Sequence, residues 1–225
     1  MLELLVVMAI IFILAGLSVG SYQKIRQSSL RASCMSNLKS ISYSMCMYLS
    51  DHDSAMIQYE NPAGDKWTTI LVSNEYLHEG NYFEPIGVTS GNARDVGLEP
   101  LHCPSDMSDM DVFFQDKYAA GGSYAINRDI TSSPTVERKW THIKNAHNKV
   151  LLCDYNQQGM LNNSNQRVSA GSNNNNWKNG GSKSSGTVGT PHLGGSNCLF
   201  ADWHVAPQHF DAFEDENFSL ETNFN

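Results

Sequence analysis

The fold of this 225-residue chain is decided by residues 4–20, LLVVMAIIFILAGLSVG, which hold no charged side chain. A helix rises about 1.5 Å per residue, so a run of this length approaches the roughly 30 Å thickness of a bilayer core. The run is hydrophobic on every side, so it is not an ordinary amphipathic surface helix. It lacks the basic n-region and the A-x-A site of a secretory signal peptide. A buried core helix is the other alternative, and we favour a membrane span or a helix that is buried among copies of itself.

A single charged residue, Glu3, accompanies this run within the first 23 residues. A carboxylate at the centre of a bilayer costs about 2.5–3.5 kcal/mol on insertion scales. Glu3 therefore either lies at the level of the headgroups or needs a positive partner once the helix packs among others.

The rest of the chain is acidic. Residues 50–225 hold 11 Lys or Arg and 22 Asp or Glu, and the formal net charge of the whole chain is −8. This balance argues against a nucleic-acid-binding protein that works through a broad basic face. The 40% of hydrophobic residues excludes disorder of the whole chain.

The helix is expected to continue well past the apolar run, because no Gly or Pro occurs between Ser21 and Asn61. Apolar residues in this part recur, from the second one on, at helical steps of 4, 3, 4 and 3. They are Ile25, Cys34, Leu38, Ile41, Met45 and Tyr48. We predict one helix from near residue 2 to near residue 50, about 75 Å long. Its first part, residues 1–23, projects, and its amphipathic part, residues 24–50, packs on the globular remainder of the chain.

Residues 51–225 are predicted to form a β-rich domain in an α+β arrangement. The expected strands are short, rich in β-branched and aromatic residues, and separated by Gly, Pro, Asn and Asp. They are Lys66–Val72, Ser123–Asn127, Val136–Ile143, Val150–Tyr155 and Cys198–Val205. Asn, Ser and Gly fill 19 of the 29 positions of residues 162–190, which predicts a long surface loop.

The N-terminal sequence MLELLVVMAIIFILAG resembles that of type IV pilins and the related pseudopilins. In that family a prepilin peptidase cuts before the hydrophobic helix, the new N-terminus is methylated, and a glutamate neutralises the N-terminal amine of a neighbouring subunit. Glu3 matches that glutamate. The family would place two more residues before Met1, and a short basic leader before those.

Three further segments resemble a bacterial branch of prepilin-like proteins. Cys34 opens CMSNLKSIS, which resembles the branch's C-x-N-N-L-K-x-I stretch, and PHLGGSNCLFADWHV resembles its H-X9-DG signature. Trp203 stands where that signature has Gly. The residues that match the CPSD and H-X9-DG segments are Cys103, Pro104, Ser105, Asp106, His192 and Asp202. The resemblance implies a type IV pilin-like α+β fold, with the second half of a long N-terminal helix packed on a C-terminal antiparallel sheet domain with long loops.

Gly16 and Gly20 form a G-x-x-x-G pattern, which permits close helix–helix approach. Each Gly also costs about 1 kcal/mol of helix stability relative to Ala. We therefore expect a locally unwound point near these residues in an assembled filament, and we place Met1, Glu3 and both glycines in the assembly interface.

The chain has five cysteines, so at least one thiol stays free. The first predicted disulfide is Cys34–Cys103, and the second is Cys153–Cys198 between two expected strands. Buried free thiols are the alternative for both pairs. No two of these cysteines have C-x-x-C spacing, so a zinc ribbon is not expected.

Two groups of residues could bind a metal ion, but each also has an explanation that involves no metal. His192, Asp202 and His204 resemble a metal-binding pattern, although bracing of a loop against a strand explains them better. Asp106, Asp109 and Asp111 would suit Ca²⁺, but they lack the Gly and Glu of an EF-hand. We expect no catalytic residues and no required cofactor.

The sequence as a whole predicts a structural subunit that polymerises through its N-terminal helix into an extracellular filament. The expected partners are copies of itself, prepilin peptidase, the pilus assembly machinery and, before assembly, the cytoplasmic membrane. The alternatives are a minor pseudopilin of a type II secretion or DNA-uptake machine, and a monomeric membrane-anchored binding protein. Asn162 and Asn217 each begin an N-x-S pattern, which is the acceptor pattern for glycosylation and also occurs often by chance.

Overall fold

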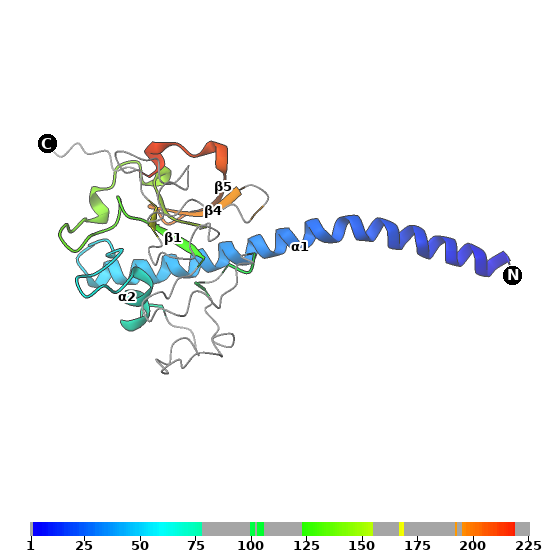
Figure 1. The fold of residues 1–225 in the computed structure, drawn as a ribbon, viewed down its shortest axis with the longest axis horizontal. Helices are drawn as coiled ribbons and strands as arrows, with labels where there is room; N and C mark the ends of the chain where they lie inside the picture. Colours follow the sequence, from blue (N-terminus) through cyan, green and yellow to red (C-terminus); the bar gives the residue numbers. More distant parts are fainter. Residues whose placement is uncertain are drawn as a thin grey trace.

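The computed structural model describes residues 2–77, 100–101, 103–105, 123–154, 167–168, 192 and 195–218. Its first element is the helix α1, Leu2–Asp51, which confirms the prediction of one long helix. Figure 1 shows α1 projecting far out of the globular part, with the N-terminus at its distant end. The chain is α+β, since the remaining described residues form a sheet with short helices around it.

The second half of α1 buries one face against the sheet. The residues buried along this face are Cys34, Leu38, Ile41, Met45 and Tyr48. This confirms the predicted stripe from Cys34 onward. Ile25, which the prediction included, is instead 65% exposed. Every residue from 22 to 29 is exposed, so the sheet does not reach this part of the helix.

The sheet has five strands in the order β3-β1-β2-β4-β5. Their bounds, in that order, are Arg167–Val168, Tyr124–Asn127, Val150–Asp154, Gly195–Phe200 and Val205–His209. β1, β2, β4 and β5 pair antiparallel, as predicted. The two-residue strand β3 pairs parallel with β1 and corrects the expectation of a purely antiparallel sheet.

The two faces of the sheet belong to different apolar layers, because successive side chains of a strand point to opposite sides. Tyr124 and Ile126 of β1 join the layer under α1, whereas Ala125 between them joins the layer on the far side. The far layer is closed by Phe213 and Phe218 from the C-terminal segment. The sheet is thus sandwiched between α1 and that segment.

The predicted strand Lys66–Val72 is wrong, because residues Trp67–Ser73 form the helix α2. The buried residues of this segment follow a helical period. They are Trp67, Thr68, Ile70 and Leu71. Asn74 ends the helix by donating from Nδ2 to the carbonyl of Ile70 at 2.7 Å. Packing of this face outweighs the β propensity of WTTILV.

Two other predicted strands also need correction. Val136–Ile143 contains one isolated bridge at Val136, one at Lys139 and the 3₁₀ helix η3, Trp140–His142. The expected strand Cys198–Val205 is divided into β4 and β5 by a tight turn at residues 201–204. The predictions for Ser123–Asn127 and Val150–Tyr155 are confirmed within one residue at the ends that the structure describes.

Truncating the buried stripe is expected to destabilise the fold strongly. Leu38→Ala removes a fully buried side chain from between α1 and the sheet, which costs about 2–5 kcal/mol of unfolding free energy. Urea unfolding of the full chain in detergent, followed by tryptophan fluorescence, measures this loss. Tyr43→Ala is the matched control, because Tyr43 is 63% exposed on the same helix. Equal losses for the two variants would contradict the packing described above.

Candidate assembly surface and disulfide cluster

The projecting half of α1 carries an apolar surface that nothing in the described part of this chain covers. Eight large hydrophobic side chains within its first 13 residues are between 48% and 71% exposed. They are Leu4, Val6, Val7, Met8, Ile10, Ile11, Phe12 and Ile13. Soluble monomers rarely expose apolar patches larger than about a few hundred Å². This part of α1 is therefore a candidate interaction surface, and we call these eight residues the apolar rod.

The predicted assembly residues lie on the same half of α1. Glu3 is in its first turn and Gly20 is inside it, but the side chain of Glu3 and the exposure of Gly20 lie outside the described part, as does Met1. A Cβ atom added at Gly16 would meet nothing within 4 Å. Packing within the described part of this chain therefore does not explain the glycine at residue 16.

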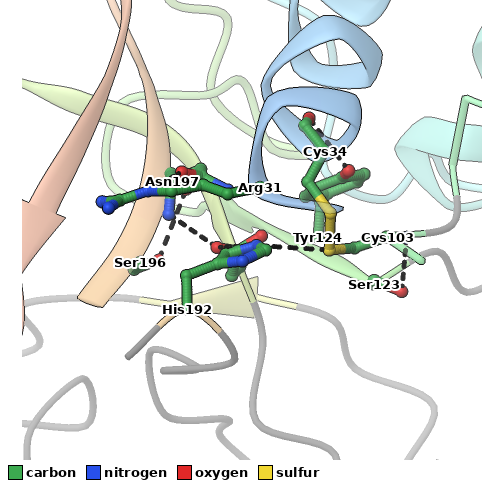
Figure 2. Close-up of a disulfide and its surroundings, with 9 residues drawn as sticks. Arg31, Cys34, Cys103, Ser123, Tyr124, His192, Ser196 and Asn197 are labelled. Atoms are coloured by element: carbon green, nitrogen blue, oxygen red, sulfur yellow. Dashed lines mark hydrogen bonds and ion pairs between the residues drawn. A yellow bond between two sulfur atoms is a disulfide. The ribbon is translucent and has the colours of Figure 1, made fainter. Parts of the chain in front are cut away.

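A disulfide bond joins the helix to the globular part at Cys34 and Cys103, as the first predicted pair (Figure 2). Both residues are fully buried and their Cα atoms are 4.9 Å apart. The backbone N–H of Cys103 donates to Ser123 Oγ at 3.0 Å, and Tyr124 Oη donates to the carbonyl of Cys34 at 3.2 Å. The bond thus fastens α1 beside the first residues of β1.

His192 lies directly against this bond. Its Nε2 atom is 3.4 Å from Cys103 Sγ and 3.6 Å from Asp154 Oδ2, and both His192 and Asp154 are almost fully buried. Backbone hydrogen bonds in both directions tie His192 to Gly195 at the start of β4. The CPSD and H-X9-DG segments therefore meet at one place, through Cys103 and His192.

A short polar chain extends from the residues around the disulfide bond to the side of α1 (Figure 2). We call these residues the disulfide cluster, and they are Cys34, Cys103, Asp154 and His192. The backbone N–H of Asn197 donates to Asp154 Oδ2 at 2.6 Å, and Arg31 Nε donates to Asn197 Oδ1 at 3.3 Å. Sequence reasoning missed Asp154, Asn197 and Arg31 as members of this site. One signal was present, since Asp154 is a carboxylate directly after the buried strand residues VLLC.

The imidazole of His192 is held neutral. Burial, followed by the positive charge of Arg31, lowers the pKa of His192 from 6.5 to about 4. Asp154, 3.6 Å away, would favour the imidazolium, but burial and Arg31 prevail. At neutral pH, Nε2 or Nδ1 therefore carries a free lone pair.

This depressed pKa makes the stability of the fold depend on pH. Between pH 6.5 and pH 4 the unfolded chain binds a proton at His192 that the folded chain does not bind. Unfolding free energy is therefore lost as the pH falls through this window, by roughly 3 kcal/mol at its acidic end. Urea midpoints at pH 7 and pH 4 measure the loss, and His192→Gln is expected to reduce it. Identical pH profiles for the two proteins would show that His192 does not titrate in this way.

The proposed trio of His192, Asp202 and His204 is not brought together. His192 pairs with the first residue of β4, whereas Asp202 and His204 lie in the turn after its last residue. Five strand steps of about 3.3 Å separate these ends. Asp202 Oδ1 instead accepts a hydrogen bond from the exposed His204 ring at 2.5 Å. A metal site made of these three residues is excluded.

The turn explains the one departure from the resembled signature. Trp203 has φ +74°, in the left-handed region that favours glycine, and it stands where the signature has Gly. Its indole packs against Trp140, with ring centroids 6.3 Å apart, and Trp140 Nε1 donates to the carbonyl of Ala201 at 2.6 Å. These contacts hold a bulky residue in a backbone conformation that costs about 1–2 kcal/mol.

The second predicted disulfide is not formed. Cys153 and Cys198 face each other in register on β2 and β4, but both are free thiols in the apolar layer on the far side of the sheet. Burial raises the pKa of both thiols, so they behave as small apolar side chains. Cys46 is the third free thiol.

The predicted calcium ligands and most of the predicted surface loop lie outside the part of the chain that the structure describes. Asp106, Asp109, Asp111 and Asn162 lie outside the described residues, and so do residues 162–190 apart from β3. Asn217 is buried, its Oδ1 accepts from the N–H of Glu214, and its Nδ2 donates to the carbonyl of Asn148. The side chain of Asn217 is therefore not free to accept a sugar in the folded chain.

Comparison with protein-family models, with curated proteins and with solved structures found no match to this chain. Among the described residues, no helix was found to be long and apolar enough to cross a membrane.

Proposed function

We propose that this chain is a structural subunit that polymerises through α1 into a type IV pilus-like filament. The observation that carries the proposal is the apolar rod, which projects from a folded domain and has no partner among the described residues of its own chain. The proposal gives the chain no catalytic role. Cleavage by prepilin peptidase, and residence in the cytoplasmic membrane before assembly, stay predictions from the sequence.

The distribution of the rod's side chains favours a polymer over a dimer. At about 100° per residue, its eight residues are spread around the whole circumference of the helix. A single partner helix would cover one side and leave the others in water. A bundle of α1 helices from several subunits covers all sides, with the globular parts outside it.

The charges fit this arrangement. Residues 50–225 carry all but one of the acidic residues of the chain, whereas the first 23 residues carry Glu3 alone. An acidic outer layer keeps filaments soluble and apart. In the apolar centre, a carboxylate is costly unless it is paired, and the resemblance to type IV pilins assigns it the N-terminal amine of a neighbouring subunit.

Electron microscopy of material sheared from the cell surface tests the proposal. Helical filaments into which α1 and the sheet domain fit, with α1 in the centre, are the expected result. A chain that stays monomeric on the surface, at normal abundance and with no filaments, would overturn it.

Glu3→Gln is expected to block assembly, since it removes the charge that pairs with the neighbouring amine and sets the register of the subunits. The measurement compares the filament yield with the total subunit level detected by antibody. Glu60→Gln is the matched control, because Glu60 is bound to Lys66 at 2.9 Å on the globular part. Filaments of normal yield from Glu3→Gln would remove this role from Glu3.

A further inference from the structure

The disulfide cluster gathers a set of atoms that suits a metal ion. The two Sγ atoms of Cys34 and Cys103 and a ring nitrogen of His192 all lie within 4.8 Å of one another, and all three residues are buried. Two thiolates and an imidazole are typical zinc ligands. We propose that, when the Cys34–Cys103 bond is reduced, its two thiolates and Nε2 of His192 bind one Zn²⁺ ion.

One sulfur–nitrogen distance already matches a tetrahedral site. With Zn–S of about 2.3 Å and Zn–N of about 2.0 Å, sulfur and nitrogen ligands lie about 3.5 Å apart. Cys103 Sγ and His192 Nε2 are 3.4 Å apart. The two sulfurs need a separation of about 3.8 Å in such a site. The two sulfurs must therefore move apart, and cleavage of the S–S bond allows this.

Asp154 is our candidate for the fourth ligand. Its Oδ2 atom is 3.6 Å from Nε2, close to the roughly 3.3 Å expected between nitrogen and oxygen ligands of zinc. The backbone N–H of Asn197 already orients this oxygen. Two thiolates, one carboxylate and Zn²⁺ leave one negative charge, and the guanidinium of Arg31 offsets it at the rim of the cluster.

The reaction balances with a dithiol as the reductant. Two electrons and two protons from the dithiol convert the Cys34–Cys103 disulfide into two thiols, and the dithiol becomes a disulfide. Zn²⁺ then displaces the two thiol protons, because His192 is already neutral. Oxidation reverses the sequence and releases the ion. In either state a cross-link fastens α1 to the segment that contains Cys103, and this inference does not depend on filament formation.

The test uses the full chain in detergent with Cys46→Ala, Cys153→Ala and Cys198→Ala, which removes the other three thiols. One sample is prepared oxidised, and the other is kept reduced by a phosphine without oxygen. Zn²⁺ is titrated against a chromophoric chelator. We expect one ion per chain and two released protons in the reduced sample, and no binding in the oxidised one. Co²⁺ in place of Zn²⁺ is expected to show tetrahedral thiolate absorption.

His192→Gln in the same background separates a site from mere thiol binding. Its loss of Zn²⁺ affinity is expected to exceed the roughly 10–100-fold that removal of a supporting residue costs, while its oxidised form keeps the disulfide and the fold. Equal Zn²⁺ binding by oxidised and reduced chains, no binding by the reduced chain, or an unchanged affinity in His192→Gln would each overturn the proposal. The oxidised and reduced samples are the same polypeptide, so the comparison needs no variant of Cys34 or Cys103.

Discussion

Cys34→Ser combined with Cys103→Ser is expected to lower the unfolding free energy by about 4 kcal/mol. The bond closes a loop with a sequence separation of 69, and the chain-entropy estimate for a loop of that length is about 4 kcal/mol at 25 °C. For a chain of this size, such a loss lowers the melting temperature by about 8–16 °C. Thermal and urea unfolding of the oxidised wild type and of the double variant measure it.

Cys46→Ser is the control for this experiment. Cys46 is a free, partly exposed thiol on the same helix, so its replacement is expected to change the unfolding free energy by no more than about 0.5 kcal/mol. A loss of less than about 1 kcal/mol in the double variant would mean that the bond is not what fastens α1 to the segment that contains Cys103.

The bounds of α1 and the identity of its buried face were predictable, because both depend on local patterns. A stretch without Gly or Pro and a repeated step of 3 or 4 residues determine where a helix runs and which side it buries. We placed Ile25 on the same stripe, although the regular steps begin only at Cys34, and Ile25 is exposed because the sheet does not reach this part of the helix. The extent of the sheet determines how much of α1 is buried, and the strands of the sheet are distant from α1 in the sequence.

The errors in the sheet have the same origin. Residues 67–73 have the composition of a strand, and only the burial of Trp67, Ile70 and Leu71 against the core shows that they are helical. The turn that divides residues 198–205 depends on the left-handed conformation of Trp203, which its sequence does not suggest. Here contacts across the fold override local propensity.

The disulfide cluster was predicted only in part. We predicted the Cys34–Cys103 pair, and resemblance to a family marked His192, but the same resemblance also grouped His192 with Asp202. Topology separates these two, because β4 runs between them, and it brings in Asp154 from the neighbouring strand instead. Register partners of this kind become visible only when the order of the strands is known.

Phe12→Lys is expected to abolish filament formation while the globular part stays folded. Phe12 is 71% exposed near the C-terminal end of the apolar rod, so lysine at this position removes no packing within the described part of its own chain. In a bundle of α1 helices the same ammonium group loses its water, and a cost of about 2.5–3.5 kcal/mol at each subunit weakens every contact of the polymer by about 100-fold. The yield of filaments in sheared material, relative to total subunit, measures the effect.

Val136→Lys is the matched control, because Val136 is a 49% exposed apolar residue in a turn of the globular part. It receives the same charge outside the apolar rod, and its filament yield is expected to equal that of the wild type. A protease digest that releases the same stable core from both variants shows that neither is unfolded. If Phe12→Lys forms filaments as Val136→Lys does, the apolar rod is not the surface through which the subunits assemble. The exposed side chains of α1 would then require a different partner, and a single apolar groove is ruled out by their distribution around the helix.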